Sequence, residues 1–344
     1  MSQRRTDVDM VRFLALASMY VAHVAPVSGP ARVLELSEYL TMPLFALLVG
    51  VGAQLGAWST DPTPHRWWSI AVRATVLVLL GLALERAGAQ VVIVLVHLGV
   101  LVVVAGVLAR WPGIAVALVA AAAVVANELL LRWDPTDLLL RDTWTTDLAR
   151  FVWVGGPYRL LPMVLYAAIG MVLSRWWLRG PQVRSALLPG AVGGGLLVVA
   201  AAMLAAEQAG RIDLVPYSGT LQETLLDALV AAGVLGVGLA AARAADDRAL
   251  GRAVLTVLAA AGAMTLTLYA LQVLWLAFDV RVLHPGRADD TWTNLGVLLI
   301  GSLVLAGAWH VVVRRQPWCM GPIEGLVATF SARAGPRVAS SRRG

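Results

Sequence analysis

The stretch DVDMVRFLALASMYVAHVAP, residues 7–26, decides how this chain is classified. It is largely apolar and about long enough to cross a bilayer, which takes about 20 helical residues. Yet it carries Asp9, Arg12 and His23. Ionisable side chains inside such a helix are rare, face protein or water, and mark function by default. The stretch therefore predicts a membrane-spanning helix with a polar role.

Arg12 and His23 share one face of this helix. A helix turns about 100° per residue, so eleven steps bring the two side chains to within about 20° of each other and about 16 Å apart along the axis. Asp9 lies one turn before Arg12 and about 40° from the direction of His23. Taken singly, Arg12 also suits an interfacial anchor with Asp9 as its surface partner, and His23 suits a neutral packing histidine.

The rest of the chain has the composition of a polytopic membrane protein. Of 344 residues, 59% are hydrophobic and 14% are charged, and the mean hydropathy is +0.76. Soluble domains carry about 25% charged residues. We therefore expect an all-α polytopic membrane protein with about ten transmembrane helices. The expected segments are 10–28, 38–58, 68–84, 90–109, 113–131, 158–177, 186–206, 224–242, 253–279 and 292–313.

These segments form a single expected domain over residues 1–331, followed by a basic tail, 332–344, that is predicted to be disordered. The longest connection, 132–159, suits either a lid over a polar substrate or a plain solvated connector. If the N-terminus is cytoplasmic, 18 of the 27 basic residues lie on that side and 9 on the other. The positive-inside rule therefore predicts that both termini are cytoplasmic.

Composition also limits the partners. All 27 basic residues are arginine, and with the Ala, Val, Leu and Gly bias this suggests a GC-rich bacterial genome. The net charge of +6 does not imply nucleic-acid binding in a polytopic protein. The chain has one cysteine, Cys319, and five scattered histidines, so we expect no disulfide framework and no metal site.

Residues 4–23 resemble the first helix of the transmembrane acyltransferases, a superfamily that includes the acyltransferase-3 enzymes and the heparan-α-glucosaminide N-acetyltransferase group. In those proteins this helix carries an Arg, an Asp, a second Arg, ten residues and then a His. The matching positions here are Arg5 (or Arg4), Asp9, Arg12 and His23. One departure is that Phe, rather than the usual Gly, follows Arg12.

Four further stretches are similar to the heparan-acetyltransferase group and its bacterial inner-membrane relatives. They are MPLFALLVGVGAQLG (42–56), YRLLPMVLYAAIGMVLSR (158–175), GAMTLTLYALQ (262–272) and RRQPWCMGPIEGLVATFS (314–331). In the last, those relatives have Trp and a later Arg after Gly-Pro-x-Glu, whereas this chain has Gly325 and no Arg before Arg333. The departure leaves Glu324 without an assigned role.

The resemblance implies a membrane acyltransferase that moves an acyl group, acetyl by preference, from cytoplasmic acyl-CoA to an extracytoplasmic sugar or glycan-type acceptor. It implies that His23 and Asp9 are catalytic. His23 would act as a general base or a transient acyl carrier, and Asp9 would orient Arg12 or keep the stripe neutral overall. Arg12, with Arg66 and Arg73, would pair with the phosphates of CoA.

Three other polar residues are candidates for substrate binding at the depth of His23: His97, Tyr269 and Gln272. Each also suits packing or hydrogen bonding between helices. The resemblance further implies a homodimer in membrane lipid. Two alternatives stay open: a proton-coupled small-molecule transporter or flippase, which the intramembrane charges also suit, and a membrane scaffold without catalytic activity.

Overall fold

The structure is a computed structural model, and it describes residues 5–26, 29, 31–59, 63–133, 140–141, 143–154, 156–179 and 185–332. These ranges contain helices and no strand. The helices are α1 (Thr6–Val24), α2 (Ala31–Ala57), α3 (Thr63–Glu85), α4 (Leu95–Leu108), α5 (Gly113–Arg132), α7 (Trp144–Ala149), η1 (Arg150–Val154), α8 (Leu160–Trp177), α9 (Leu187–Gln208), α10 (Leu221–Asp246), α11 (Ala249–Ala263), α12 (Thr265–Phe278), η3 (Asp279–Leu283), α13 (Trp292–Val312), η4 (Trp318–Met320) and α14 (Pro322–Ala332).

Eight of these helices are long and apolar enough to cross a membrane: α2, α3, α5, α8, α9, α10, α12 and α13. α4 and α11 are apolar but shorter, and α1 carries three charged residues in its first half. The expected all-α polytopic class is therefore confirmed. The number of ten spans and the side of the termini stay predictions, and nearly all of the basic tail, from residue 333 on, lies outside the described residues.

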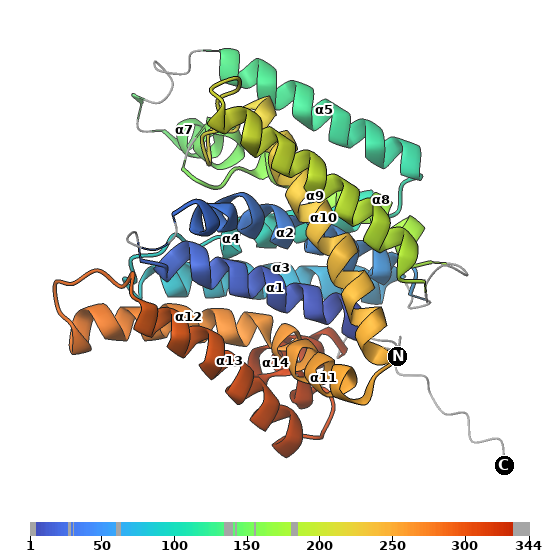
Figure 1. The fold of residues 1–344 in the computed structure, drawn as a ribbon, viewed down its shortest axis with the longest axis vertical. Helices are drawn as coiled ribbons and strands as arrows, with labels where there is room; N and C mark the ends of the chain where they lie inside the picture. Colours follow the sequence, from blue (N-terminus) through green and yellow to red (C-terminus); the bar gives the residue numbers. More distant parts are fainter. Residues whose placement is uncertain are drawn as a thin grey trace.

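α1 lies in the middle of the molecule (Figure 1), with α8, α9 and α10 on one side and α11 to α13 on the other. It contacts α2, α10, α11 and α13. Leu16, Met19 and Tyr20 are fully buried in the centre of α1, and the Tyr20 hydroxyl bonds to Ser302 of α13 at 2.8 Å. Because protein surrounds α1, its polar side chains are shielded from lipid.

α2 and α8 pack at the closest distance that two helices allow. A Cβ atom on Gly50 of α2 would collide with the backbone of Ala167, and one on Gly170 of α8 would collide with the carbonyl of Leu47. Small residues permit this backbone contact, which is a common way for helices to associate in membranes. The paired glycines therefore fix where α2 and α8 meet.

The expected segment 253–279 is not one helix but two. α11 ends at Ala263 and α12 begins at Thr265, with Met264 between them. Glu324 of α14 occupies the break: its Oε1 accepts from the backbone N–H groups of Leu266 (2.7 Å) and Thr267 (3.1 Å). The N–H groups at the start of α12 are therefore paired, because the Glu324 carboxylate replaces the carbonyl acceptors that a preceding helical turn would have supplied.

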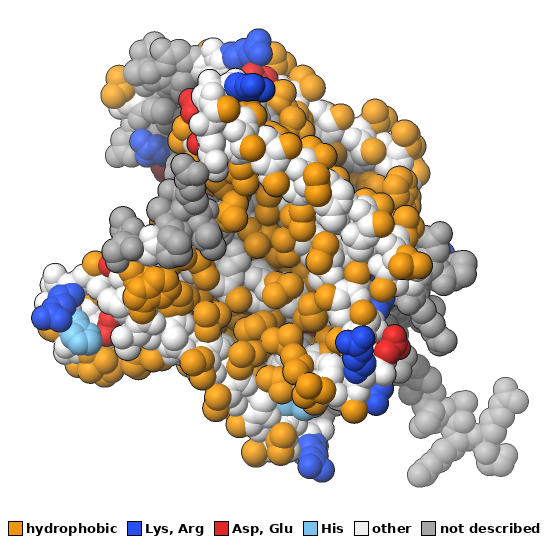
Figure 2. Space-filling model, in the orientation of Figure 1, with side chains coloured by type: hydrophobic (Ala, Val, Ile, Leu, Met, Phe, Trp, Pro, Cys, Tyr) orange, Lys and Arg blue, Asp and Glu red, His pale blue; other side chains and the backbone are white. Residues whose placement is uncertain are grey.

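The outer surface is suited to lipid. Figure 2 shows hydrophobic side chains across the middle of the molecule and charged ones toward its margins. Among the most exposed are Ile114 and Leu118 of α5 and Leu187 and Val198 of α9. Exposed aliphatic belts of this kind cost little in a bilayer and would be unfavourable in water.

Candidate functional site

The polar stripe of α1 begins with an ion pair. The Arg12 guanidinium donates to the carboxylate of Asp9 one turn earlier. The Asp9 side chain is 3% exposed, whereas that of Arg12 is 32% exposed. Gly262 of α11 packs against the backbone of Asp9, which explains the burial of this turn. Arg12 therefore has exposed guanidinium surface beside a buried counter-charge.

His23 lies at the other end of α1 and contacts a residue from a distant part of the sequence. Its Nδ1 is 2.9 Å from the side-chain nitrogen of Gln272 on α12. Gln272 is 1% exposed, and its Oε1 has no hydrogen-bond partner among the described residues. Rotating the amide by half a turn would place Oε1 against Nδ1–H and leave Nε2 of His23 unprotonated. Gln272 can thus hold either tautomer of His23.

The other two expected substrate-binding residues lie on neighbouring elements. Tyr269 is three residues before Gln272 on α12, and its hydroxyl accepts from the backbone N–H of Val94 at 3.4 Å. His97 follows on α4, stacked on the ring of Phe151 with centroids 4.1 Å apart. Neither ring nitrogen of His97 has a partner within the described ranges. The fold therefore brings Gln272 directly to His23, and places Tyr269 beside the start of α4.

The connection 132–159 is partly folded, because it contributes α7 and η1. Thr143 caps α7 by accepting from the backbone N–H of Thr146. Phe151 of η1 and Tyr158 both contact His97, the second with its ring at 6.2 Å. This part of the connection thus covers a half-buried histidine. Whether it acts as a lid over substrate stays a prediction.

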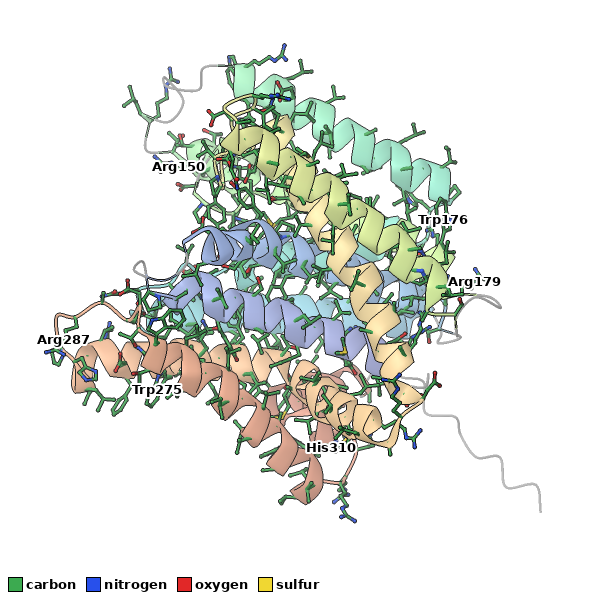
Figure 3. All side chains as sticks on the ribbon, viewed as in Figure 1. Arg150, Trp176, Arg179, Trp275, Arg287 and His310 are labelled. Carbon is green, nitrogen blue, oxygen red and sulfur yellow. The ribbon has the colours of Figure 1, made fainter. Side chains whose placement is uncertain are left out.

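Arginines gather where α1 begins and where α2, α4, α8 and α10 end. We call this region the arginine-rich end; it comprises Arg5, Arg66, Arg110, Arg175, Arg179 and Arg243. In Figure 3, Arg179 and Trp176 lie at the right of the view, whereas Arg150 and Arg287 lie at the left, at the opposite end of the helices. A cavity of about 410 Å³ opens here, lined by Gln54, Ala57, Trp58, Arg66, Ala109, Arg110, Trp111, Arg175 and Arg179.

The arginines of this cavity differ in how many of their N–H donors form hydrogen bonds within the protein. Arg175 donates to the Gln54 side chain (2.8 Å) and to the carbonyls of Ala109 and Trp111. Arg66 donates to one carbonyl, at the end of α2. Arg179 lies over the Trp58 ring, with its Cζ 5.5 Å from the ring centroid. The guanidinium groups of Arg179 and Arg110 form no hydrogen bond with the described part of the chain. Their donors suit a phosphate group.

The expected CoA-binding set is thus divided. Arg66 lines the arginine cavity, whereas Arg12 and Arg73 do not; Arg73 is exposed farther along α3. Sequence reasoning missed Arg110, Arg175 and Arg179 as binding residues. Their predicted position at one side of the membrane was the available signal, but only the fold shows that the ends of α2, α4 and α8 enclose a common space.

The cavity and His23 lie far apart along the bundle. The hydroxyls of Ser18 and Thr41 are 2.9 Å apart, which sets α1 and α2 at a common level. From that level, His23 is five residues away in one direction and Gln54 thirteen in the other, a total of about 27 Å at about 1.5 Å per residue. The two polar groups can serve one reaction only through an elongated substrate.

Comparisons of the chain with protein-family models, with curated proteins and with solved structures find no match. Over the residues that the structure describes, no group of three or more His, Cys, Asp or Glu side chains is placed to hold a metal ion. Any function therefore has to be argued from the arginine cavity and from the buried polar contacts of α1.

Proposed function

We propose that this chain is a membrane acyltransferase of a bacterial plasma membrane, with both termini in the cytoplasm. It transfers an acyl group, acetyl by preference, from acyl-CoA to an extracytoplasmic sugar or glycan-type acceptor. Acyl-CoA enters at the arginine-rich end, and transfer takes place near His23. The proposal combines the resemblance of the first helix with the geometry of the two polar groups.

The arginine cavity is the observation that carries the proposal. Four guanidinium groups line about 410 Å³ of open space, and those of Arg110 and Arg179 keep their donors available. CoA bears several phosphate charges at its nucleotide end, and paired guanidinium donors are the preferred protein partner of phosphate. Trp58 and Trp111 supply flat apolar surface at the same cavity. The rest of CoA is a long, slim arm directed toward Arg12 and His23.

His23 supplies the base in the proposed reaction. With Gln272 holding Nδ1–H, the Nε2 atom of His23 takes the proton from the acceptor hydroxyl or amine as that group attacks the thioester carbonyl. The bond from the acyl carbon to sulfur breaks, and the CoA thiolate receives the proton from His23. Direct transfer avoids an acyl-imidazole exposed to water, which the acyl-carrier route would require.

Binding and chemistry can be tested separately because the two groups are about 27 Å apart. The first test measures thermal unfolding of detergent-purified protein with increasing acetyl-CoA. Wild type should be stabilised saturably, since a ligand of the folded state raises its stability. The double variant Arg110→Gln/Arg179→Gln should need at least about tenfold more acetyl-CoA, because each charged hydrogen bond contributes about 1.5–3 kcal/mol. Arg132→Gln, an exposed arginine of α5, is the matched control and should behave as wild type.

The second test measures consumption of acetyl-CoA by vesicles supplied with a sugar acceptor. His23→Gln should bind acetyl-CoA normally but lose turnover by at least about a hundredfold, within the range expected for a general base. Retained turnover in His23→Gln would show that His23 is not the general base. Unchanged acetyl-CoA binding in the double arginine variant would exclude the arginine cavity as the acyl-CoA site.

Proton-coupled transport is the second candidate, and one observation favours it. The break between α11 and α12 resembles the discontinuous helices around which transporters bind their substrates. If acetyl-CoA stabilises neither wild type nor His23→Gln, transport becomes the better proposal. It would then predict pH-gradient-driven uptake of a small solute into vesicles, with loss of uptake in Glu324→Gln.

A further inference from the structure

The end of the bundle opposite the arginines carries buried acidic side chains. We call it the carboxylate end and define it by Glu223, Asp227, Asp279 and Asp289. Glu223 and Asp227 lie one turn apart at the start of α10. Glu223 is well satisfied, because its carboxylate accepts from the backbone N–H groups of Tyr217 (2.6 Å) and Gly219. The carboxylate of Asp227, one turn later, is less well satisfied.

One carboxylate oxygen of Asp227 accepts from the Tyr166 hydroxyl of α8 at 2.8 Å. The other, Oδ1, has no partner among the described residues, although Asp227 is only 3% exposed. The hydroxyl of Thr224, three residues earlier and equally buried, makes no hydrogen bond of standard geometry there, although it interacts with the Tyr166 hydroxyl. Two buried oxygens without such a hydrogen bond are unusual, since buried polar groups are nearly always hydrogen-bonded.

Both residues line the same small cavity between α2, α8 and α10. Its volume is about 10 Å³, which is about the space that one water molecule or one small ion requires. Met42 of α2 and Tyr166 of α8 close its sides. These two oxygens therefore face a space that fits a single small particle.

The charge around this cavity is negative. Arg159 is the one basic side chain lining it, and it donates to two backbone carbonyls of the neighbouring turn. The carboxylate that acts on its guanidinium is that of Glu223. Burial raises the pKa of the Tyr217 hydroxyl, and the nearby carboxylates of Glu38, Asp227 and Glu223 raise it further. A buried carboxylate without a compensating charge is strongly unfavourable.

We propose that Asp227 Oδ1 and Thr224 Oγ1 bind a Na⁺ ion in this cavity. Hard cations take oxygen ligands, and a carboxylate oxygen and a hydroxyl oxygen supply two of them here, with the ion itself filling the cavity. One monovalent ion neutralises the carboxylate that Arg159 leaves uncompensated. A water molecule alone would satisfy the hydrogen bonds but not the charge. Both proposed ligands lie on α10, and the site does not depend on acyl transfer.

The test uses the purified full chain in detergent, in buffer in which choline chloride is replaced stepwise by NaCl at constant ionic strength. The thermal unfolding midpoint of wild type should rise with Na⁺ and reach a plateau. Asp227→Asn should show no rise, because the isosteric amide keeps the Tyr166 contact but loses the charge. Asp213→Asn, an exposed carboxylate in the connection before α10, is the matched control and should respond as wild type.

Thr224→Val removes one oxygen and should shift half-saturation to at least about tenfold higher Na⁺. If Asp227→Asn does not fold, this variant and the broadening of the ²³Na resonance by wild type decide the question. The inference is wrong if Asp227→Asn responds like wild type, or if K⁺ gives the same response as Na⁺. It is also wrong if the midpoint depends on pH but not on Na⁺, since a proton would then neutralise Asp227.

Discussion

The arginine-rich end and the carboxylate end satisfy their charges in opposite ways. At the first, the guanidinium groups of Arg66, Arg175 and Arg243 donate to carbonyls at or just beyond the C-terminal ends of α2, α4 and α8. At the second, Glu223 accepts from the backbone N–H groups that precede α10. Each end thus places the charge that the helix dipole favours at that terminus.

The two ends differ in how many hydrogen-bond donors or acceptors stay unused after the helix ends are capped. An arginine has five N–H donors, so a guanidinium that caps a helix can still bind a phosphate. At the carboxylate end, the buried oxygens without a hydrogen-bond partner among the described residues include those of Asp227, Thr224 and Asp289. A charged side chain at a helix end therefore indicates a binding site only when it has donors or acceptors beyond those that the helix uses. Three substitutions test this view.

The largest expected effect is at the arginine-rich end. Asp7 pairs with Arg5 at 2.8 Å and with Arg243 at 3.4 Å, and the Arg243 side chain is 9% exposed. Asp7→Asn should destabilise the protein by about 3 kcal/mol, because it leaves a buried guanidinium without its counter-charge. Denaturant unfolding in detergent measures this.

The control for that substitution is Glu128→Gln, which breaks an ion pair with a 73% exposed arginine of α5. It should change stability by less than about 1 kcal/mol. Equal losses of stability in the two variants would show that the buried ion pairs of the arginine-rich end stabilise the protein no more than an exposed pair does. The contrast between the two ends would then be weaker.

An intermediate effect is expected at the carboxylate end. Glu223→Ala removes the acceptor for the N–H groups of Tyr217 and Gly219, and Tyr217 has a positive φ of 61° that this turn must hold. We expect a loss of about 2 kcal/mol and faster amide hydrogen exchange in the turn. Asp213→Ala, exposed in the same connection, should leave exchange unchanged.

The smallest effect concerns Glu324, whose pKa is raised by burial although hydrogen bonds from Thr267 and Leu266 oppose the rise. The folded chain therefore holds this proton more tightly than the unfolded chain does. Stability from this group is greatest at low pH and falls as pH rises from the ordinary value of 4.5 through the folded pKa.

Glu324→Gln keeps an acceptor for the start of α12, so at low pH it should cost no more than about 1 kcal/mol. It should also reduce the decline of the unfolding midpoint as pH rises. If Glu324→Gln has the same pH dependence as wild type, then ionisation of the Glu324 carboxylate does not lower the stability of the folded chain.

Local spacing predicted part of the candidate site. The period of the helix places Arg12 and His23 on one face, and the fold buries α1 in the centre as a polar membrane helix requires. The contact between His23 and Gln272 joins residues 249 positions apart, so no local pattern reveals it. For the same reason the break at Met264 escaped prediction: the segment is largely apolar, and its cap is a distant glutamate.

The glycine contact between α2 and α8 has a mechanical consequence. Gln54 and Arg175, from these two helices, line the arginine cavity, and Met42 and Tyr166, from the same two helices, line the small acidic cavity. Between them, backbone touches backbone at Gly50. Gly170 makes a second backbone contact, with Leu47, so α2 and α8 are held along each other and not at one point alone. A side chain larger than glycine at Gly50 or Gly170 would force α2 and α8 apart and would therefore change the lining of both cavities at once.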